Sequence, residues 1–137
     1  MKTFNIVMLS LSALALFYAS FSRLIDPSRA VFLQTYLDNS GNNLDNHIDW
    51  VNEIRGVGAV MFLGGIIAIL GAIKPGFRET AFVVVTVIFA GVVLGRSISF
   101  ILDGVPNQGL IRVAIIEGVL AVLNIFCLAY ILMKGNT

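Results

Sequence analysis

Charged side chains are scarce in this sequence. Asp, Glu, Lys and Arg together make up 12% of its 137 residues, whereas 58% are hydrophobic. Soluble domains carry roughly 25% charged residues, so this chain lacks the polar surface needed to face water on all sides. The composition therefore excludes an ordinary soluble domain. It indicates an integral membrane protein, whose main partner is the lipid bilayer.

Cysteine and histidine are almost absent. The chain has one Cys and one His, so an internal disulfide is excluded, and one thiol with one imidazole does not make a metal site. The net charge is +1 and there is no run of Lys or Arg, which argues against nucleic-acid binding. A nucleophile–base pair and a phosphate-binding loop are also missing. We therefore expect no metal, no cofactor and no enzymatic activity.

What the chain does contain is four long apolar runs. A membrane-spanning helix needs about 20 mostly apolar residues, and such runs occur at residues 4–23, 50–73, 78–102 and 110–133. The short connectors after the second and third runs contain Gly and Pro, where helices end. The sequence predicts an all-α fold, with residues 1–137 forming one integral membrane four-helix bundle.

The first run has an alternative interpretation. Lys2 followed by an apolar stretch and small residues resembles a secretory signal peptide. The run is longer than the roughly 7–15 apolar residues of a signal peptide. Its small residues at positions 12, 15, 19 and 22 also recur at helical spacing, which suits packing against another helix. We therefore expect a retained membrane span.

The charges that flank the runs predict an orientation. Lys2, Lys74, Arg78 and Lys134 belong to one end of the bundle, whereas acidic residues predominate at the other. Short loops rich in Lys and Arg stay on the cytoplasmic side. We therefore expect a bacterial inner (cell) membrane protein with both termini in the cytoplasm and residues 24–49 on the periplasmic side.

The periplasmic loop has two parts. Residues 28–37 follow Pro27 and carry an apolar side, which predicts a short helix at the membrane interface. Further on, Asp45, His47 and Asp49 alternate, so that an extended strand would place three potential metal ligands on one face. We favour the alternative, a solvated polar loop, because the segment does not follow the calcium-loop pattern.

Small residues recur at helical spacing within the runs. Gly91 and Gly95 form a GxxxG pair in the third run, and Gly64, Ala68 and Ala72 continue the spacing in the second. Such spacing lets helices approach closely in lipid. It fits either packing within one bundle or a homodimer interface. We expect packing within the bundle, because every run carries such a stripe and all of them cannot face a partner.

Ionisable residues within the apolar runs are the most informative feature. A charge at the bilayer centre costs about 2.5–3.5 kcal/mol, so these side chains should face the bundle interior and pair. Helix rise places Arg96 about 9 Å and Glu117 about 12 Å inside the periplasmic boundary. We therefore predict that Arg96 pairs with Glu117 and that Glu53 pairs with Arg55 or Arg112. Arg112 lies about 140° from Glu117 around its helix, so it is better placed to extend to the interface.

Helical spacing groups further polar residues with these charges. Arg96, Ser99 and Asp103 share one helix face, and Glu117 and Asn124 share another. The candidate residues for a ligand pocket or an ion-pair network are Glu53, Arg55, Arg96, Ser99, Asp103, Glu117 and Asn124.

Several of these residues stand in motifs that resemble a known family. They are Glu53-Ile54-Arg55-Gly56-Val57-Gly58, Leu94-Gly95-Arg96, Asp103-Gly104 and Glu117. They are similar to an uncharacterised bacterial membrane family, domain of unknown function 4345, and the resemblance covers most of the chain. It implies a four-helix inner-membrane protein whose charged positions act as one unit and, by a weaker likeness, a relation to DoxX-type bundles. It implies no reaction.

Three classes of function are compatible with these features. The one we favour is a binding or accessory protein, alone or in a larger membrane complex, whose charged pocket opens to the periplasm and holds a lipid, a quinone or another amphipathic molecule. The alternative is a small dimeric proton-coupled transporter. Such a transporter needs an unpaired carboxylate, whereas Glu117 has an arginine at similar depth. An enzyme is the least favoured, because the sequence lacks catalytic groups.

Overall fold

The computed structural model describes residues 2–27 and 48–135, and these residues form helices without any strand. The four long helices are α1 (Lys2–Leu24), α3 (Ile48–Ile73), α4 (Arg78–Leu102) and α5 (Gln108–Gly135). A single 3-10 turn, η3 (Pro75–Phe77), connects α3 to α4. The predicted all-α, four-helix fold is confirmed, and each helix begins and ends within two residues of its predicted run.

Each long helix presents apolar side chains to the outside of the bundle. Leu14 is 72% exposed, Ile101 81% and Val122 66%. Exposure on this scale would be unfavourable in water and is expected for side chains that face lipid tails. Within the described residues, four helices are long and apolar enough to cross a bilayer. The protein is a multi-pass membrane protein.

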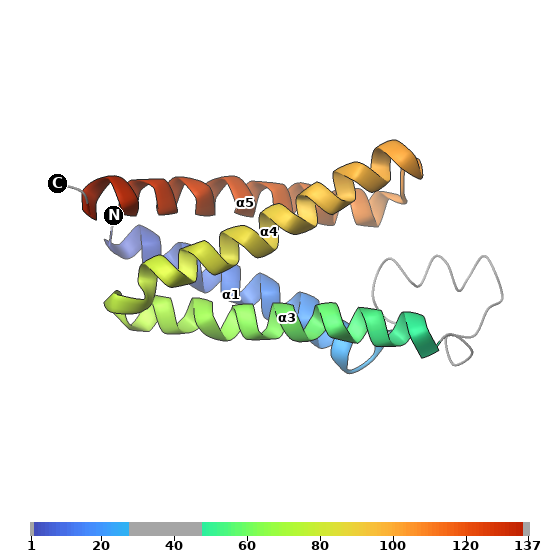
Figure 1. The fold of residues 1–137 in the computed structure, drawn as a ribbon, viewed down its shortest axis with the longest axis horizontal. Helices are drawn as coiled ribbons and strands as arrows, with labels where there is room; N and C mark the ends of the chain where they lie inside the picture. Colours follow the sequence, from blue (N-terminus) through green and yellow to red (C-terminus); the bar gives the residue numbers. More distant parts are fainter. Residues whose placement is uncertain (1, 28–47, 136–137) are drawn as a thin grey trace.

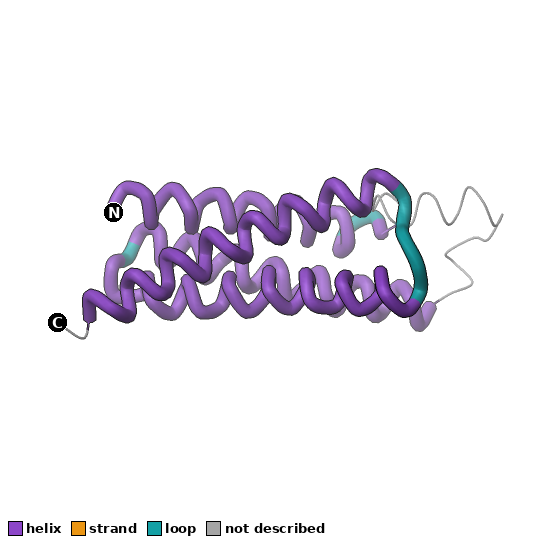
Figure 2. The backbone as a smooth tube through the Cα atoms, turned by 90° about the horizontal axis from the view of Figure 1, so that it is seen from above, coloured by secondary structure: helices purple, strands orange, loops and turns teal. Residues whose placement is uncertain are grey.

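The helices pack as two pairs joined by a hairpin. Helix α1 packs along α3, helix α4 packs along α5, and α3 contacts α4 through the hairpin that contains η3. Figure 1 shows the first residues of α1, the η3 turn and the last residues of α5 at the same end of the bundle, and Figure 2 shows the turn between α4 and α5 at the opposite end. We refer to these as the terminal end and the loop end.

Hydrogen bonds and one glycine within the connecting segment fix the conformation of the turn between α4 and α5. The backbone N–H of Asp103 donates to the carbonyl of Ser99 at 2.8 Å and closes α4. Gly104 then adopts a φ of 100°, a left-handed conformation that glycine adopts without steric cost. The side chain of Asn107 accepts a hydrogen bond from the Leu110 N–H at 3.0 Å, as an N-cap does. The chain therefore reverses sharply and α5 runs back along α4.

The buried core lies towards the terminal end. Leu9, Leu16, Phe82 and Val85 are almost fully buried. Beyond Phe89, by contrast, α4 exposes most of its side chains, including Leu94 at 63%. Helix α4 crosses from α3 towards α5 as it approaches the loop end (Figure 1). The bundle is thus tightly packed at one end and opens between α3 and α4 at the other.

Gly64 of α3 packs inside the bundle as predicted, because an added Cβ atom would collide with the side chain of Ile88, and two further glycines of α3 also pack closely. A Cβ atom built on Gly65 would lie 2.9 Å from the ring of Phe17, and one on Gly71 would collide with the Cβ of Ala81. The prediction is wrong for the GxxxG pair of α4. Gly91 and Gly95 are exposed, and a Cβ atom on either would meet nothing within 4 Å. The physical reason is the divergence of α4 from α3, which leaves this face of α4 without a helix against it.

Several expectations for the first loop lie outside the described residues. These are the interfacial helix at 28–37 and the residues Asp45 and His47. Asp49 belongs to the first turn of α3. Asp49 is therefore helical, and the extended strand considered for Asp45, His47 and Asp49 does not include it.

Candidate functional site

Arg96 on α4 and Glu117 on α5 form the pair that the sequence predicts. The Nε of Arg96 donates to Oε2 of Glu117 at 2.6 Å, and a terminal guanidinium nitrogen donates to Oε1 at 3.2 Å. Two parallel bonds between a guanidinium and a carboxylate are among the strongest side-chain interactions. The side chains are only 15% and 10% exposed. The pair therefore ties α4 to α5 in the half of the bundle nearer the loop end.

Arg23 is a member of this site that sequence reasoning missed. It lies at the end of α1, where one guanidinium nitrogen donates to the carbonyl of Ala19 at 2.7 Å. Its charge interacts with those of both Arg96 and Glu117. The site thus joins α1, α4 and α5. The sequence did contain an indication that Arg23 faces the bundle interior. Arg23 lies eleven residues after Ser12, so the two share a helix face, and Ser12 is buried.

Gly58 of α3 allows Arg23, at the end of α1, to lie close to the ion pair. A Cβ atom at this position would lie 2.9 Å from the Cβ of Arg23 and 3.2 Å from the side chain of Leu24. The absence of a side chain lets the end of α1 lie directly on α3. The last residue of the Glu53–Gly58 motif therefore has a packing role and brings an arginine towards the ion pair.

Asn124 is buried deeper in the bundle, away from the charges. Its Nδ2 donates to Ser12 Oγ at 2.9 Å and to the carbonyl of Leu120 at 2.8 Å, and Ser12 Oγ lies 3.3 Å from its Oδ1. Both side chains are fully buried. These bonds join α1 to α5 at a level where the two helices otherwise make few contacts. Asn124 is thus satisfied by protein groups and acts as a structural cross-link.

Ser99 and Asp103 share a helix face, as their spacing predicts, but they stand apart from the ion pair. The hydroxyl of Ser99 donates to Asp103 Oδ2 at 2.8 Å, and both side chains are exposed. Their bond lies at the end of α4 and reinforces its last turn.

Glu53 does not form the pair predicted for it. Among the described residues, neither Arg55 nor Arg112 lies within ion-pair distance of its carboxylate, and all three side chains are exposed. Two residues along a helix correspond to about 200° of rotation, so Arg55 points away from the side that Glu53 occupies. Arg112 belongs to α5, which packs mainly on α4.

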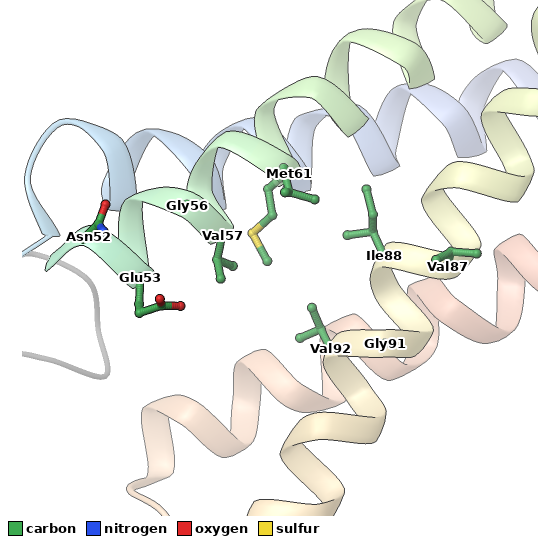
Figure 3. Close-up of a pocket in the computed structure, with 10 residues that line it drawn as sticks. Asn52, Glu53, Gly56, Val57, Met61, Val87, Ile88, Gly91 and Val92 are labelled. Carbon is green, nitrogen blue, oxygen red and sulfur yellow. The ribbon is translucent and has the colours of Figure 1, made fainter. Parts of the chain in front are cut away.

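Glu53 instead stands at the edge of a groove between α3 and α4. The groove has a volume of about 680 Å³. Figure 3 shows Glu53 and Val57 of α3 on one side of it and Ile88 and Val92 of α4 on the other. It is lined by Asn52, Glu53, Gly56, Val57, Val60 and Met61 of α3 and by Val87, Ile88, Gly91 and Val92 of α4. Among these residues Glu53 carries the charge, and the rest of the surface is mostly apolar.

A smaller cavity lies behind the groove. It has a volume of about 130 Å³, and its wall includes Glu117 and residues of α1, α3, α4 and α5. Met61, Ile88 and Val92 line both spaces. These three side chains therefore form a thin apolar layer between the groove and the cavity that borders the ion pair.

Residues 5–128 match the model of the family described as a domain of unknown function (DUF4345). The protein belongs to this family. Comparisons with curated proteins and with solved structures found no match. The match covers the DUF4345 protein from Asn5 to Leu128, so the ion pair, Arg23 and the groove all lie within the family domain.

Proposed function

We propose that the protein is a membrane binding protein that holds an amphipathic molecule in the groove between α3 and α4. The observation that carries this proposal is an apolar groove of about 680 Å³ with one carboxylate, that of Glu53, at its edge. Ligand sites of roughly 300–1,000 Å³ with apolar walls and few polar groups are common in proteins. An apolar tail would lie against Val57, Met61 and Ile88, and a polar head would lie beside Glu53.

The carboxylate restricts the chemistry of the head group. Glu53 lies five residues after the first residue of α3, which corresponds to about 8 Å along the helix axis. This depth is close to the polar head groups of a bilayer. An ionised carboxylate accepts hydrogen bonds and attracts cations. We infer that the preferred head group is an amine or another hydrogen-bond donor.

The Arg96–Glu117 pair has a supporting role in this proposal. It holds α4 against α5, and α4 leaves α3 in the same half of the molecule. An α4 held on α5 keeps the groove open to the bilayer. The pair also counts against the alternative function of proton-coupled transport. Such transport uses an unpaired carboxylate deep in the membrane, and Glu117, the deep carboxylate of this chain, accepts two hydrogen bonds from Arg96.

Filling the groove should displace the bound molecule. In Gly91→Leu the new side chain enters the groove, and because nothing lies within 4 Å of the added Cβ, the fold should tolerate it. We expect labelling by a photoactivatable long-chain amine, measured by mass spectrometry on protein in nanodiscs, to fall at least tenfold.

The charge of Glu53 should determine which head group is preferred. The wild type should be labelled more strongly by the long-chain amine than by a long-chain alcohol, and Glu53→Gln should abolish this preference.

Gly95→Leu is the matched control for this experiment. Gly95 lies one turn further along α4, is equally exposed and has equally free space, but it does not line the groove. This variant should be labelled like the wild type. Equal labelling of wild type, Gly91→Leu and Gly95→Leu would contradict the groove as the binding site.

We also propose that the protein lies in the bacterial inner membrane with its terminal end in the cytoplasm. Lys2, Lys74, Arg78 and Lys134 belong to this end, because they stand at the start of α1, on either side of η3 and in the last turn of α5. Their charge supports the orientation through the positive-inside rule. Alkaline phosphatase fused after Thr137 should be inactive, whereas the same enzyme inserted within residues 41–43 should be active. Expression of both fusions at equal levels, checked by immunoblot, is the control. The reverse pattern would overturn the orientation.

A further inference from the structure

A third cavity lies at the terminal end, far from the groove. It has a volume of about 460 Å³ and is formed where α1, α5 and the start of α4 meet. Its wall includes Lys2 of α1, Arg78 of α4 and Lys134 of α5. Glu79 is the acidic residue in the same wall. Three cations from three different helices thus face one carboxylate, and the lining carries a net positive charge.

Two residues in the cavity wall each hold a buried polar atom that has no hydrogen-bond partner among the described residues. These atoms are the Nε of Arg78, a donor, and the Oδ1 of Asn5, an acceptor. Asn5 is only 5% exposed. More than about 90% of buried polar groups in proteins are hydrogen-bonded, because leaving one unsatisfied is unfavourable. A ligand that accepts from Arg78 and donates to Asn5 would satisfy both atoms.

We propose that this cavity binds a phosphate ester that carries a hydroxyl group, which is the chemistry of a glycerol phosphate head group. The phosphate oxygens accept hydrogen bonds from Arg78 and attract the two lysines, as phosphates do at basic sites. The hydroxyl donates to Oδ1 of Asn5. The proposal goes beyond the amphipathic ligand of the groove and does not rest on it.

The position of the cavity favours a lipid as the source of this group. Lys2 and Arg78 are the first residues of their helices, so they lie where apolar spans reach the head-group layer. Phe4 and Phe77, both exposed, stand close in sequence to these cations and extend the apolar surface up to the site. Basic pockets between membrane helices bind the head groups of anionic lipids in this way. Soluble glycerol 3-phosphate shares the chemistry and is therefore tested beside the lipid.

The test measures lipid binding to the full chain by native mass spectrometry from mild detergent. We expect phosphatidylglycerol to bind at least tenfold more tightly than phosphatidylcholine, which is zwitterionic. It should also bind more tightly than phosphatidylethanol, which has the same charge but no hydroxyl. Arg78→Gln should weaken phosphatidylglycerol binding about tenfold, the effect of losing about 1.4 kcal/mol. Asn5→Leu should remove the preference for phosphatidylglycerol over phosphatidylethanol.

Two further variants make the result specific. Lys74→Gln removes a charge from the same end of the bundle but from a residue that does not line the cavity, so it should bind like the wild type. Lys2→Gln changes an exposed side chain and keeps the test valid if Arg78→Gln fails to fold. Gly91→Leu should also leave phosphatidylglycerol binding unchanged, which separates this site from the groove.

The proposal would be overturned if phosphatidylglycerol bound no better than phosphatidylcholine. It would also be overturned if Lys74→Gln weakened binding as much as Arg78→Gln and Lys2→Gln did, because the effect would then be general surface attraction. Equal binding of phosphatidylglycerol and phosphatidylethanol by the wild type would overturn the role of Asn5. Displacement of phosphatidylglycerol by millimolar glycerol 3-phosphate would support the site and identify a soluble ester as a competing source.

Discussion

Arg96→Ala and Glu117→Ala should each lower the free energy of unfolding by about 3–5 kcal/mol. Each change leaves a charge without its bidentate partner in a place where the pair is only 15% and 10% exposed. The remaining charge then has little water to solvate it, which is the costly step. The free energy of unfolding in detergent micelles, measured by steric trapping, checks the size of the effect.

A double-mutant cycle separates the pair from its surroundings. The variant Arg96→Leu/Glu117→Leu should recover most of the lost stability, because no isolated charge is left behind. Arg112→Ala is the matched control: it removes an exposed arginine from α5 and should change stability by no more than about 0.5 kcal/mol. Additive losses in the double mutant would mean that the two side chains do not interact as described.

Gly71→Leu should be strongly destabilising. A Cβ atom at this position would collide with the Cβ of Ala81 and lie 3.3 Å from the backbone carbonyl of Phe77. Neither a Cβ atom nor the backbone can move away without shifting a helix. Overpacking of this kind costs about 1–3 kcal/mol and sometimes more, and here the α3–α4 hairpin must open to relieve it. We expect a loss of about 3 kcal/mol, measured by the same unfolding assay.

Gly95→Leu is the corresponding control in open space. No heavy atom lies within 4 Å of its added Cβ, and leucine is a better helix former than glycine. This variant should be as stable as the wild type or slightly more stable. If Gly71→Leu were equally well tolerated, the close packing of α3 on α4 near η3 would be refuted.

The residues differ in how far the sequence predicted their roles. The pair of Arg96 and Glu117 was predictable, because helix rise gives both residues similar depth on neighbouring antiparallel helices. The bond between Ser99 and Asp103 follows from their spacing within one helix. Arg23 was not recognised, since a cation at the end of a run looks like an ordinary flanking charge. Its approach to the pair depends on how closely α1 lies on α3 at Gly58.

The sequence alone determined that this is a four-helix membrane protein and where each helix begins and ends. These properties follow from the length of each apolar run, the scarcity of charge and the Gly and Pro residues of the connectors. All of these act locally along the chain, so the sequence alone is enough to recognise them. Only the tertiary structure decided which faces meet. The GxxxG pair of α4 remains exposed, and Glu53 borders a groove without the predicted arginine. Both outcomes depend on the angle at which α4 leaves α3 and crosses to α5. That angle results from packing across the whole bundle, and helical periodicity does not encode it.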